Sequence, residues 1–309
     1  MKDHAVLIVN PRSGRNQTGR RWKDMEALIQ RSLPDVVTRM TESAGHATEL
    51  TREALRQGAS LVVAVGGDGT NNEVVNGFFE PSGQAIAPEA SFGFIAAGTG
   101  SDLGRSFGHG GGLRAAAQRI AGAAPRPLDL GRITYTGHDG QERQRLFVNI
   151  ASFGVSGLVV RTVNSRTSGG KLAYAMSTAG AIFRYKSSPV TLQIDDDEPR
   201  TLDLMLCAVA NGQFFGGGMQ IAPHAVPDDG SFDVVTVAGW KPMGFLSNAP
   251  KVYSGSHLSL AGVEEHRGVR RLRASPSAGA QVLIDLDGEQ PGVLPASFEI
   301  LPGAIRIRG

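Results

Sequence analysis

The stretch between positions 61 and 73 reads LVVAVGGDGTNNE, and it decides the fold of the first half of the chain. Its first five residues are apolar and predict a short strand that is buried on both faces. Gly66 and Gly67 end this strand, because paired glycines favour turns. The segment 72–79 then predicts a helix. A buried strand that passes through a glycine loop into a helix is the repeating unit of an α/β domain.

The same alternation extends on both sides of this stretch. Apolar runs predict strands at 5–9, 36–40 and 92–96, and helical spacing predicts helices at 19–33 and 46–56. Strands and helices in this order indicate a parallel sheet with helices on both faces. The pattern fades near Pro125 and Pro127, so residues 1–128 are predicted to form an α/β domain.

The second half of the chain is predicted to be mostly β. Residues 129–309 are expected to form a β sandwich, whose last strand can rejoin the first domain. The acidic run 195–199 predicts a solvated hairpin tip rather than a metal site. Residues 158–185 give the one clear helical segment. Strands are predicted at 132–135, 146–150, 190–194, 202–210, 231–237, 269–274, 281–287 and 298–300.

Composition and charge limit the partners and the cellular compartment that we expect for this protein. The 309 residues are 41% hydrophobic and 19% charged with a net charge of +2, which argues against a nucleic-acid partner. The single cysteine, Cys207, lies in an apolar run and predicts a buried core residue in a reducing compartment. No signal peptide and no membrane-spanning run is apparent. We therefore expect a cytoplasmic protein whose contact with membranes is transient and peripheral.

Three loops follow predicted strands of the first domain, at 10–14, 66–73 and 98–102. All three carry glycine or polar residues at the carboxyl end of a strand, where an open α/β sheet binds its ligands. Successive glycines let backbone N–H groups approach phosphate oxygens, and the following helix directs its positive end at them. A single loop of this kind can also be a plain tight turn; three loops at one sheet edge favour phosphate binding.

The aspartate in the middle loop implies a metal ion. Asp68 would repel a phosphate unless a cation lay between them, and Mg²⁺ is the hard cation that prefers carboxylate and phosphate oxygens. The loops match neither the Gly-x4-Gly-Lys pattern nor the Gly-x-Gly-x-x-Gly pattern.

With these motifs the chain resembles the diacylglycerol kinase catalytic family, in particular its bacterial lipid kinases, which are related to sphingosine and ceramide kinases. The resemblance continues through LDLG at 128–131, the segments 149–157 and 211–218, GKLAY at 170–174, and IAPHAVPDDGSFD at 221–233 to DGE at 287–289. It implies a magnesium-dependent kinase that transfers the γ-phosphate of ATP to a lipid hydroxyl, in phospholipid metabolism. It also implies an active site in the cleft between a nucleotide-binding α/β domain, residues 1–128, and a β sandwich, residues 129–309.

The resemblance also assigns residues. Asp287 would be the proton acceptor, with Asp68 and Glu289 as further catalytic candidates. Mg²⁺ would be held by Asp68 and Asp102, and a structural Mg²⁺ by Asp229 with the carbonyls of Val226 and Ser231. The residues that would bind ATP are Asn10, Pro11, Arg12, Ser13, Gly14, Thr41, Gly66, Gly67, Asp68, Gly69, Thr70, Asn71, Asn72, Glu73, Gly98, Thr99 and Gly100, together with Lys171.

The acidic pattern DLDGE at 285–289 fits the chemistry that such a kinase requires. A lipid alcohol must lose its proton as it attacks phosphorus, and a positioned carboxylate is a sufficient base. On a strand, Asp285 and Asp287 would point to the same face, where each raises the proton affinity of the other. By spacing alone the pattern would be a solvated hairpin turn; the resemblance favours catalysis.

Two departures from the family concern specificity. Ser101 stands where relatives have asparagine, and Ser156 stands where many have aspartate in the acceptor region, so the identity of the lipid stays open. Phe214, Phe215 and Met219 are candidates for an acyl-chain pocket or for ordinary core. Diacylglycerol is the default acceptor; a sphingoid base, ceramide or phosphatidylglycerol are alternatives.

Two other functions compete with the lipid kinase. An NAD kinase shares the Gly-Gly-Asp-Gly-Thr loop, but the resemblance extends far beyond that loop. A non-catalytic nucleotide or lipid sensor would be expected to lack the acidic residues Asp68, Asp102 and Asp287, which are all present. The expected partner is a lipid alcohol at a membrane surface, and the family also forms homodimers.

Overall fold

A computed structural model of the protein describes residues 4–97, 101–164 and 171–309. The chain divides into two compact units, which are treated separately below. Unit 1 consists of residues 1–130 and 302–309, and unit 2 consists of residues 131–301. Strands β5 (Arg126–Gly137) and β16 (Gly292–Ile307) contribute residues to both.

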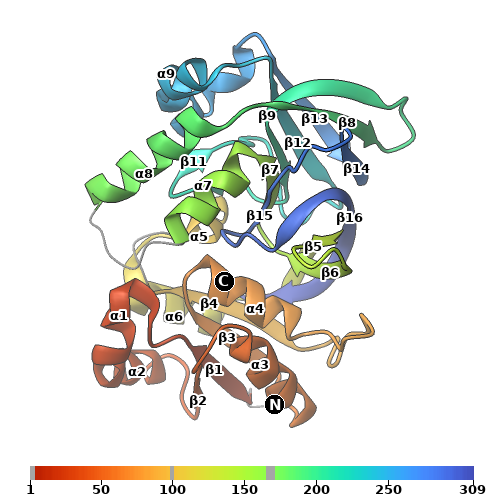
Figure 1. The fold of residues 1–309 in the computed structure, drawn as a ribbon. Coiled ribbons are helices and arrows are strands. Elements are labelled where there is room, and N and C mark those ends of the chain that lie inside the picture. The colour runs from red at the N-terminus through yellow and green to blue at the C-terminus, as the bar shows by residue number, and fades with distance from the viewer. Residues whose placement is uncertain (1–3, 98–100, 165–170) are drawn as a thin grey trace. The chain divides into compact units, whose positions relative to one another are not determined.

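Unit 1 is built on a parallel sheet in the order β4-β3-β1-β2 (Figure 1). The end of β16 adds to its β4 edge, where Arg306 pairs with Ser91. The prediction of a parallel sheet is confirmed. The elements of this unit are β1 (Ala5–Val9), α1 (Ser13–Arg20), α2 (Trp22–Gln30), β2 (Val37–Met40), α3 (His46–Arg56), β3 (Leu61–Gly66), α4 (Asp68–Asn76), β4 (Ser91–Ala96), α5 (Asp102–Ser106) and α6 (Gly112–Gly122).

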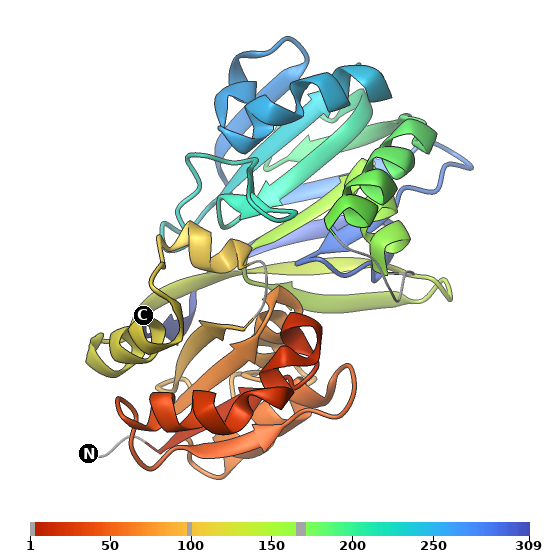
Figure 2. The same cartoon turned by 90° about the vertical axis from the view of Figure 1, so that its left-hand side faces the viewer.

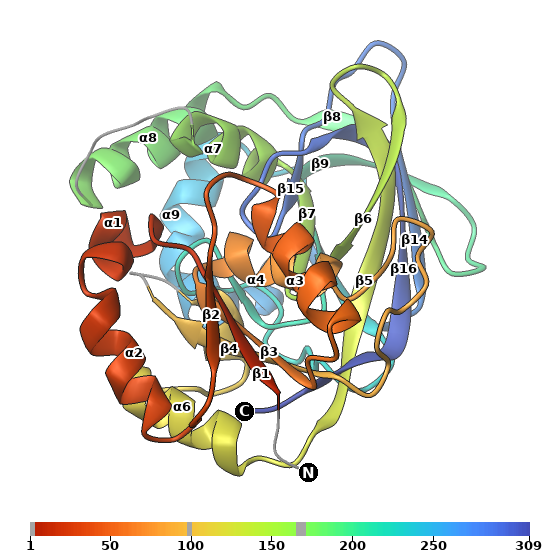
Figure 3. The same cartoon turned by 90° about the horizontal axis from the view of Figure 1, so that it is seen from below.

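Helices cover both faces of this sheet because its strands are apolar on both. Leu7 and Val63 join Trp22 and Ile29 of α2 and Ile120 of α6 in one buried cluster. On the other face α3 packs on β1 and β3, and α4 packs on β3. Figure 3 shows α2 and α6 on one side of the strands and α3 and α4 on the other.

Two boundaries in unit 1 differ from the prediction. The helix expected over 19–33 is α2, Trp22–Gln30, and a separate α1 already begins at Ser13. Helix α4 begins at Asp68, four residues earlier than predicted, so the Gly-Gly-Asp-Gly segment is the first turn of a helix rather than a long loop. The residues of the first turn of α4 are polar, so the apolar periodicity of the sequence begins only after the helix has started. The predicted helix start is therefore too late.

Unit 2 is an antiparallel sandwich-like domain, as predicted, with sheet order β13-β12-β9-β8-β14-β16 and further strands β5, β6, β7 and β15. The acidic hairpin tip is confirmed, because β8 and β9 pair antiparallel on either side of residues 195–199. Its elements are β6 (Glu142–Phe147), β7 (Ile150–Gly154), α7 (Val155–Asn164), α8 (Lys171–Arg184), β8 (Ser188–Ile194), β9 (Arg200–Ala210), β10 (Phe214–Phe215), β11 (Met219–Gln220), β12 (Phe232–Ala238), α9 (Pro242–Tyr253), a 3-10 turn (Ser256–Ser259), β13 (Val263–Val269), β14 (Arg271–Pro276) and β15 (Ile284–Leu286).

The two faces of β9 belong to different cores. Cys207 and Val209 face the sandwich interior with Phe153 and Phe232. Leu206, Ala208 and Ala210 face the helices. Cys207 is fully buried, as predicted, and burial raises the pKa of its thiol. Figure 2 shows α8 (green) and α9 (blue) on the outside of the strands that they cover.

The sequence pattern was wrong about the helices of unit 2. It gave one helical segment at 158–185, whereas the structure has α7 and α8 there and an additional helix, α9. Helix α9 contains Gly244 and Pro250 and so lacks good helix propensity. It is stabilised by packing, since Phe245 and Val252 are buried in the cluster that includes β9 and β12. None of the described helices is long and apolar enough to cross a bilayer.

Candidate active site

The first and middle loops meet in unit 1 because β1 and β3 are neighbouring parallel strands. The Asn10 side chain donates from Nδ2 to Oγ1 of Thr70 at 3.2 Å. A Cβ on Gly66 would lie 2.4 Å from that same Thr70 oxygen. The close packing of Thr70 is therefore sufficient reason for glycine at position 66. Asn10, Gly66 and Thr70 fix the two loops to one another.

The first loop is closed by its own side chains. Oδ1 of Asn10 accepts from the N–H of Arg12 at 2.9 Å, and the Ser13 hydroxyl donates to the carbonyl of Asn10 at 2.8 Å. The chain then has positive φ at Gly14, Arg15 and Asn16, with values of 59°, 59° and 67°. Two of these residues are not glycine. Such backbone conformations are uncommon and tend to occur at functional sites.

Helix α4 presents an open N-terminus at the end of β3. Gly67 is its N-cap residue, and no side chain caps the helix there. A Cβ added to Gly67 would meet nothing within 4 Å, so the space over this residue is open. The first N–H groups of a helix have no partner within the helix, and the helix dipole adds positive potential. This end of α4 fits an anionic group such as a phosphate.

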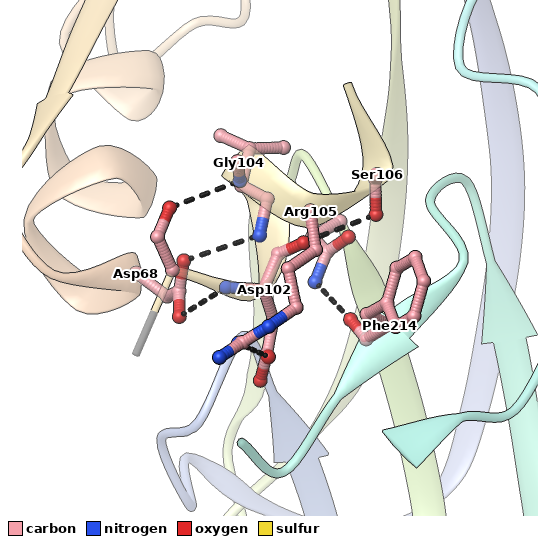
Figure 4. Close-up of polar contacts among 9 residues, drawn as sticks. Asp68, Asp102, Gly104, Arg105, Ser106 and Phe214 are labelled. Atoms are coloured by element: carbon pink, nitrogen blue, oxygen red, sulfur yellow. Dashed lines mark hydrogen bonds and ion pairs between the residues drawn. The ribbon is translucent and has the colours of Figure 1, made fainter. Parts of the chain in front are cut away.

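Two aspartates lie beside that helix end (Figure 4). Oδ2 of Asp68 accepts from the N–H of Asp102 at 3.3 Å, and Oδ1 accepts from the N–H of Leu103 at 3.4 Å. Asp102 is buried, and its carboxylate binds Arg105 at 2.6 Å. The structure therefore brings the two predicted metal ligands of this unit together. A carboxylate has about four lone-pair positions, so it can accept hydrogen bonds and bind a cation at the same time.

A magnesium ion at this place would be held by these two carboxylates together with oxygens of a bound phosphate. Within residues 4–97, 101–164 and 171–309, no three His, Cys, Asp or Glu side chains are grouped in a way that could hold a metal by themselves. Mg²⁺ in kinases is commonly held by one or two carboxylates together with substrate phosphates, which agrees with this donor set.

Several residues predicted to bind ATP also have contacts within the protein. Both carboxylate oxygens of Glu73 accept N–H groups at the start of α3, from Gly45 at 2.8 Å and from Ala47 at 3.1 Å. Asn72 is fully buried and bonds Asn76 one turn later. Asn71 is also buried. Sequence reasoning missed the capping role of Glu73, because the helix it caps lies far away in the chain; contact of these residues with ATP stays a prediction.

Some predicted residues lie outside what the structure describes. Gly98, Thr99 and Gly100 of the third loop fall outside the described residues, as does the side chain of Lys171, with which α8 begins. Their contact with nucleotide stays a prediction. Thr41 is placed directly after β2, where its N–H donates to the carbonyl of Val9 at 2.9 Å.

Asp287 in unit 2 is held by three backbone donors. Oδ2 accepts from the N–H of Val148 at 3.0 Å, and Oδ1 accepts from Asn149 at 3.2 Å and Ile150 at 3.0 Å. The side chain is 7% exposed. Charge-assisted bonds of this kind fix a carboxylate in one orientation. The structure thus gives Asp287 a role in joining the late turn to the start of β7, in addition to its predicted role as proton acceptor.

The prediction that Asp285 and Asp287 alternate along one strand is wrong. Strand β15 ends at Leu286, and Asp287 has φ 48°, so the chain turns before a second strand position is reached. The turn is closed by reciprocal backbone bonds between Leu286 and Glu289, at 2.8 and 2.9 Å. Glu289 is held by an ion pair with Arg145 at 2.7 Å. This turn separates Asp285 from Asp287. The spacing of residues along the sequence gives no information on such a turn.

Asp285 lies instead at the wall of a cavity in unit 2. The cavity is partly open, has a volume of about 260 Å³ and is lined mainly by apolar side chains of α7, α8, β9 and α9. Phe215 and Met219 line it, as the sequence suggested, whereas Phe214 is not among the lining residues. An apolar cavity with a few convergent polar groups is typical of a small-molecule site.

The polar end of this cavity is a chain of three side chains. The hydroxyl of Ser152 lies 2.8 Å from that of Ser156 and 3.2 Å from Oδ2 of Asp285. All three residues are buried. Since each hydroxyl has one proton, Ser152 can donate to Asp285 only while Ser156 donates to Ser152. Sequence reasoning singled out Ser156 and paired Asp285 with Asp287; it missed Ser152, the partner of Asp285, because β7 lies far away in the sequence.

The predicted structural metal site lies in a turn of unit 2. Oδ1 of Asp229 accepts from the N–H and the hydroxyl of Ser231, at 3.0 and 2.9 Å. Burial, together with the nearby carboxylates of Glu265 and Asp229, raises the pKa of Asp233 to about 6. The nearby Arg267 offsets part of this shift, and a cation bound in the turn would lower the pKa of Asp233 further. Ligation by the carbonyls of Val226 and Ser231 stays a prediction.

Two protein-family models match successive parts of the chain. Residues 4–133 match the diacylglycerol kinase catalytic domain family. Residues 149–309 match the YegS C-terminal NAD kinase beta sandwich-like domain family.

Curated relatives match over nearly the whole chain. A diacylglycerol kinase of Bacillus subtilis (strain 168) is 29% identical over 302 residues, which cover 95% of this chain and 92% of the relative. A diacylglycerol kinase of Mycobacterium tuberculosis is 28% identical over 305 residues, covering 98% and 94%. The solved structure of a candidate diacylglycerol kinase from Bacillus anthracis str. Sterne superimposes with a TM-score of 0.75 at 23% identity, covering 99% and 96% of the two chains. This last likeness shows the fold.

Proposed function

Since the chain belongs to the diacylglycerol kinase family of lipid kinases, we propose that it transfers the γ-phosphate of ATP to a lipid hydroxyl, with diacylglycerol as the first acceptor to test and phosphatidic acid as its product. The observation that carries the proposal is the uncapped N-terminus of α4 beside the carboxylates of Asp68 and Asp102. Backbone donors and a bound cation are what a triphosphate requires. Names of relatives support the choice of diacylglycerol.

In the proposed reaction the lipid oxygen bonds to the γ-phosphorus and the bond to the β-phosphate oxygen breaks, so that ADP leaves. The proton of the hydroxyl passes to Asp287, whose carboxylate is held in one orientation by the N–H groups of residues 148–150. Mg²⁺, when bound, neutralises charge on the phosphates. The closing of the two units around one active site stays a prediction, as does pairing into a homodimer.

The cavity in unit 2 supports a lipid acceptor over NAD. Its walls are apolar, and its one polar end is made by Ser152, Ser156 and Asp285. A cavity of 150 Å³ is known to hold benzene, so about 260 Å³ fits on the order of ten carbon atoms of one acyl chain. A dinucleotide would leave its phosphates in an apolar environment, which is costly.

The direct test is phosphate transfer from radiolabelled ATP. We expect a labelled, chloroform-soluble product with diacylglycerol and no labelled NADP with NAD, since only the former matches the apolar cavity. Sphingosine, ceramide, phosphatidylglycerol and a total lipid extract are assayed in parallel, and the labelled product is identified by mass spectrometry. Label in NADP alone, or ATP binding with no transfer to any lipid, would overturn the proposal in favour of an NAD kinase or a sensor.

The structural metal site gives a separate prediction. We expect Mg²⁺ to raise the melting temperature of the wild-type protein and not that of Asp229→Ala, because a ligand that binds only the folded state stabilises it by about 2.7 kcal/mol at 100 times its Kd. The neighbouring Asp228→Ala is the matched control and should keep the response. Differential scanning calorimetry with and without Mg²⁺ measures this; equal shifts in all three proteins would remove Asp229 as a ligand.

A further inference from the structure

Exposed apolar side chains gather on two helices of unit 2. Among the described residues, the strongly exposed large apolar side chains are six, and four of them lie on α8 and α9. These are Met176 at 67% exposure, Phe183 at 54%, Met243 at 62% and Tyr253 at 53%. The two helices pack against each other. Single exposed apolar residues are normal, whereas a cluster on adjoining elements marks an interaction surface.

The charged side chains on α8 and α9 are all basic. Neither α8 nor α9 contains an aspartate or glutamate. Four basic residues lie on or next to the two helices, and all are exposed: Arg184, Lys186, Lys241 and Lys251. In the part of the chain that the structure describes, no ion pair involves any of them. Apolar side chains among uncompensated basic ones are the pattern of a surface that binds anionic membranes.

The same two helices form walls of the acceptor cavity. Thr178 and Ile182 of α8 and Phe245 and Tyr253 of α9 line it. Tyr253 is also half exposed, so it lies where the cavity approaches the protein surface. An acyl chain that entered here from a bilayer in contact with α8 and α9 would have little exposure to water on its way, which lowers the cost of leaving the bilayer.

We propose that α8 and α9 form a docking face for an anionic lipid bilayer. Met176, Phe183 and Met243 insert at the level of the lipid head groups, and the four basic side chains contact anionic lipid. The bilayer, rather than a protein, is the occupant that the charge pattern fits. The proposal rests on the proposed function only for the origin of the acceptor, because docking itself requires no catalysis.

The test compares binding to vesicles by flotation. Wild-type protein should float with vesicles of phosphatidylcholine and phosphatidylglycerol, and less with phosphatidylcholine alone or at high salt. The double variant Met176→Ser/Phe183→Ser should bind the mixed vesicles at least about tenfold more weakly, because two apolar anchors are lost. Val37→Ser is the matched control, since Val37 is 44% exposed in unit 1 and lies on neither helix. It should bind like the wild type.

A charge variant and an activity readout complete the test. Arg184→Glu/Lys251→Glu should weaken binding to the mixed vesicles roughly fivefold or more per site and leave weak binding to phosphatidylcholine unchanged. The Met176→Ser/Phe183→Ser variant should lose phosphate transfer to diacylglycerol in vesicles but keep it with diacylglycerol in detergent micelles.

Equal flotation of the double variant and Val37→Ser would overturn the proposal. A wild-type dimer that dissociates in the double variant, with no flotation of either protein, would overturn it in favour of a contact between protein copies. If the protein transferred no phosphate at all, the proposed function would fail while flotation would still decide the docking face.

Discussion

Replacing Asp287 with alanine is expected to lower the turnover number by roughly 10²–10⁴-fold, the usual contribution of a positioned general base. The Km for ATP should change little, since the predicted ATP contacts, apart from Lys171, lie in unit 1. Steady-state kinetics with varied ATP and a fixed lipid acceptor measures both constants. Near-wild-type turnover in this variant would remove Asp287 from the mechanism.

Stability must be measured together with activity in this variant. Asp287→Ala leaves the N–H groups of Val148, Asn149 and Ile150 without their acceptor, and each buried unsatisfied donor costs on the order of 1–3 kcal/mol. Asp287→Asn keeps the shape and one acceptor oxygen but removes the charge. If the asparagine variant melts close to the wild type and still loses turnover, the base role is supported; if it recovers turnover along with stability, the role of Asp287 is structural. Glu289→Gln, in the same turn, tests the second acidic candidate separately.

Replacing Asp68 with alanine is expected to reduce kcat/Km for ATP by about 10²–10³-fold, the scale seen when one electrostatic contact to a reacting group is removed. The reason is that Asp68 is one of two carboxylates beside the open end of α4. Activity should also require more Mg²⁺. Unchanged Mg²⁺ dependence and unchanged ATP affinity, measured by titration calorimetry, would contradict the assignment.

The fold should tolerate this change better than it tolerates Asp287→Ala. The bonds that Asp68 accepts from Asp102 and Leu103 are long, at 3.3 and 3.4 Å, so their loss should cost about 1 kcal/mol or less in the free energy of unfolding. Asp68→Asn separates charge from hydrogen bonding, because the amide oxygen still accepts one of the two N–H groups. It should resemble alanine in activity and the wild type in stability.

The sequence pattern alone predicted an element correctly where the burial of apolar side chains decides its structure. The five apolar residues of β1 and the amphipathic α3 were predicted to the residue, since burial alone decides those elements. Helix α9 was missed because its glycine and proline oppose helix formation, and only the packing of Phe245 and Val252 stabilises it. For the site, residue types at the strand ends were visible in the sequence, but their partners were not.

The sequence by itself determined the alternation of strands and helices in unit 1, the β character of unit 2 and the polar residues at the strand ends, because these depend on neighbours within a few positions. Only the tertiary structure decided that Asp285 faces an apolar cavity with Ser152 while Asp287 bonds the backbone at 148–150. Their partners lie more than 130 positions away. Chain folding, rather than spacing along a strand, sets which donors and acceptors meet.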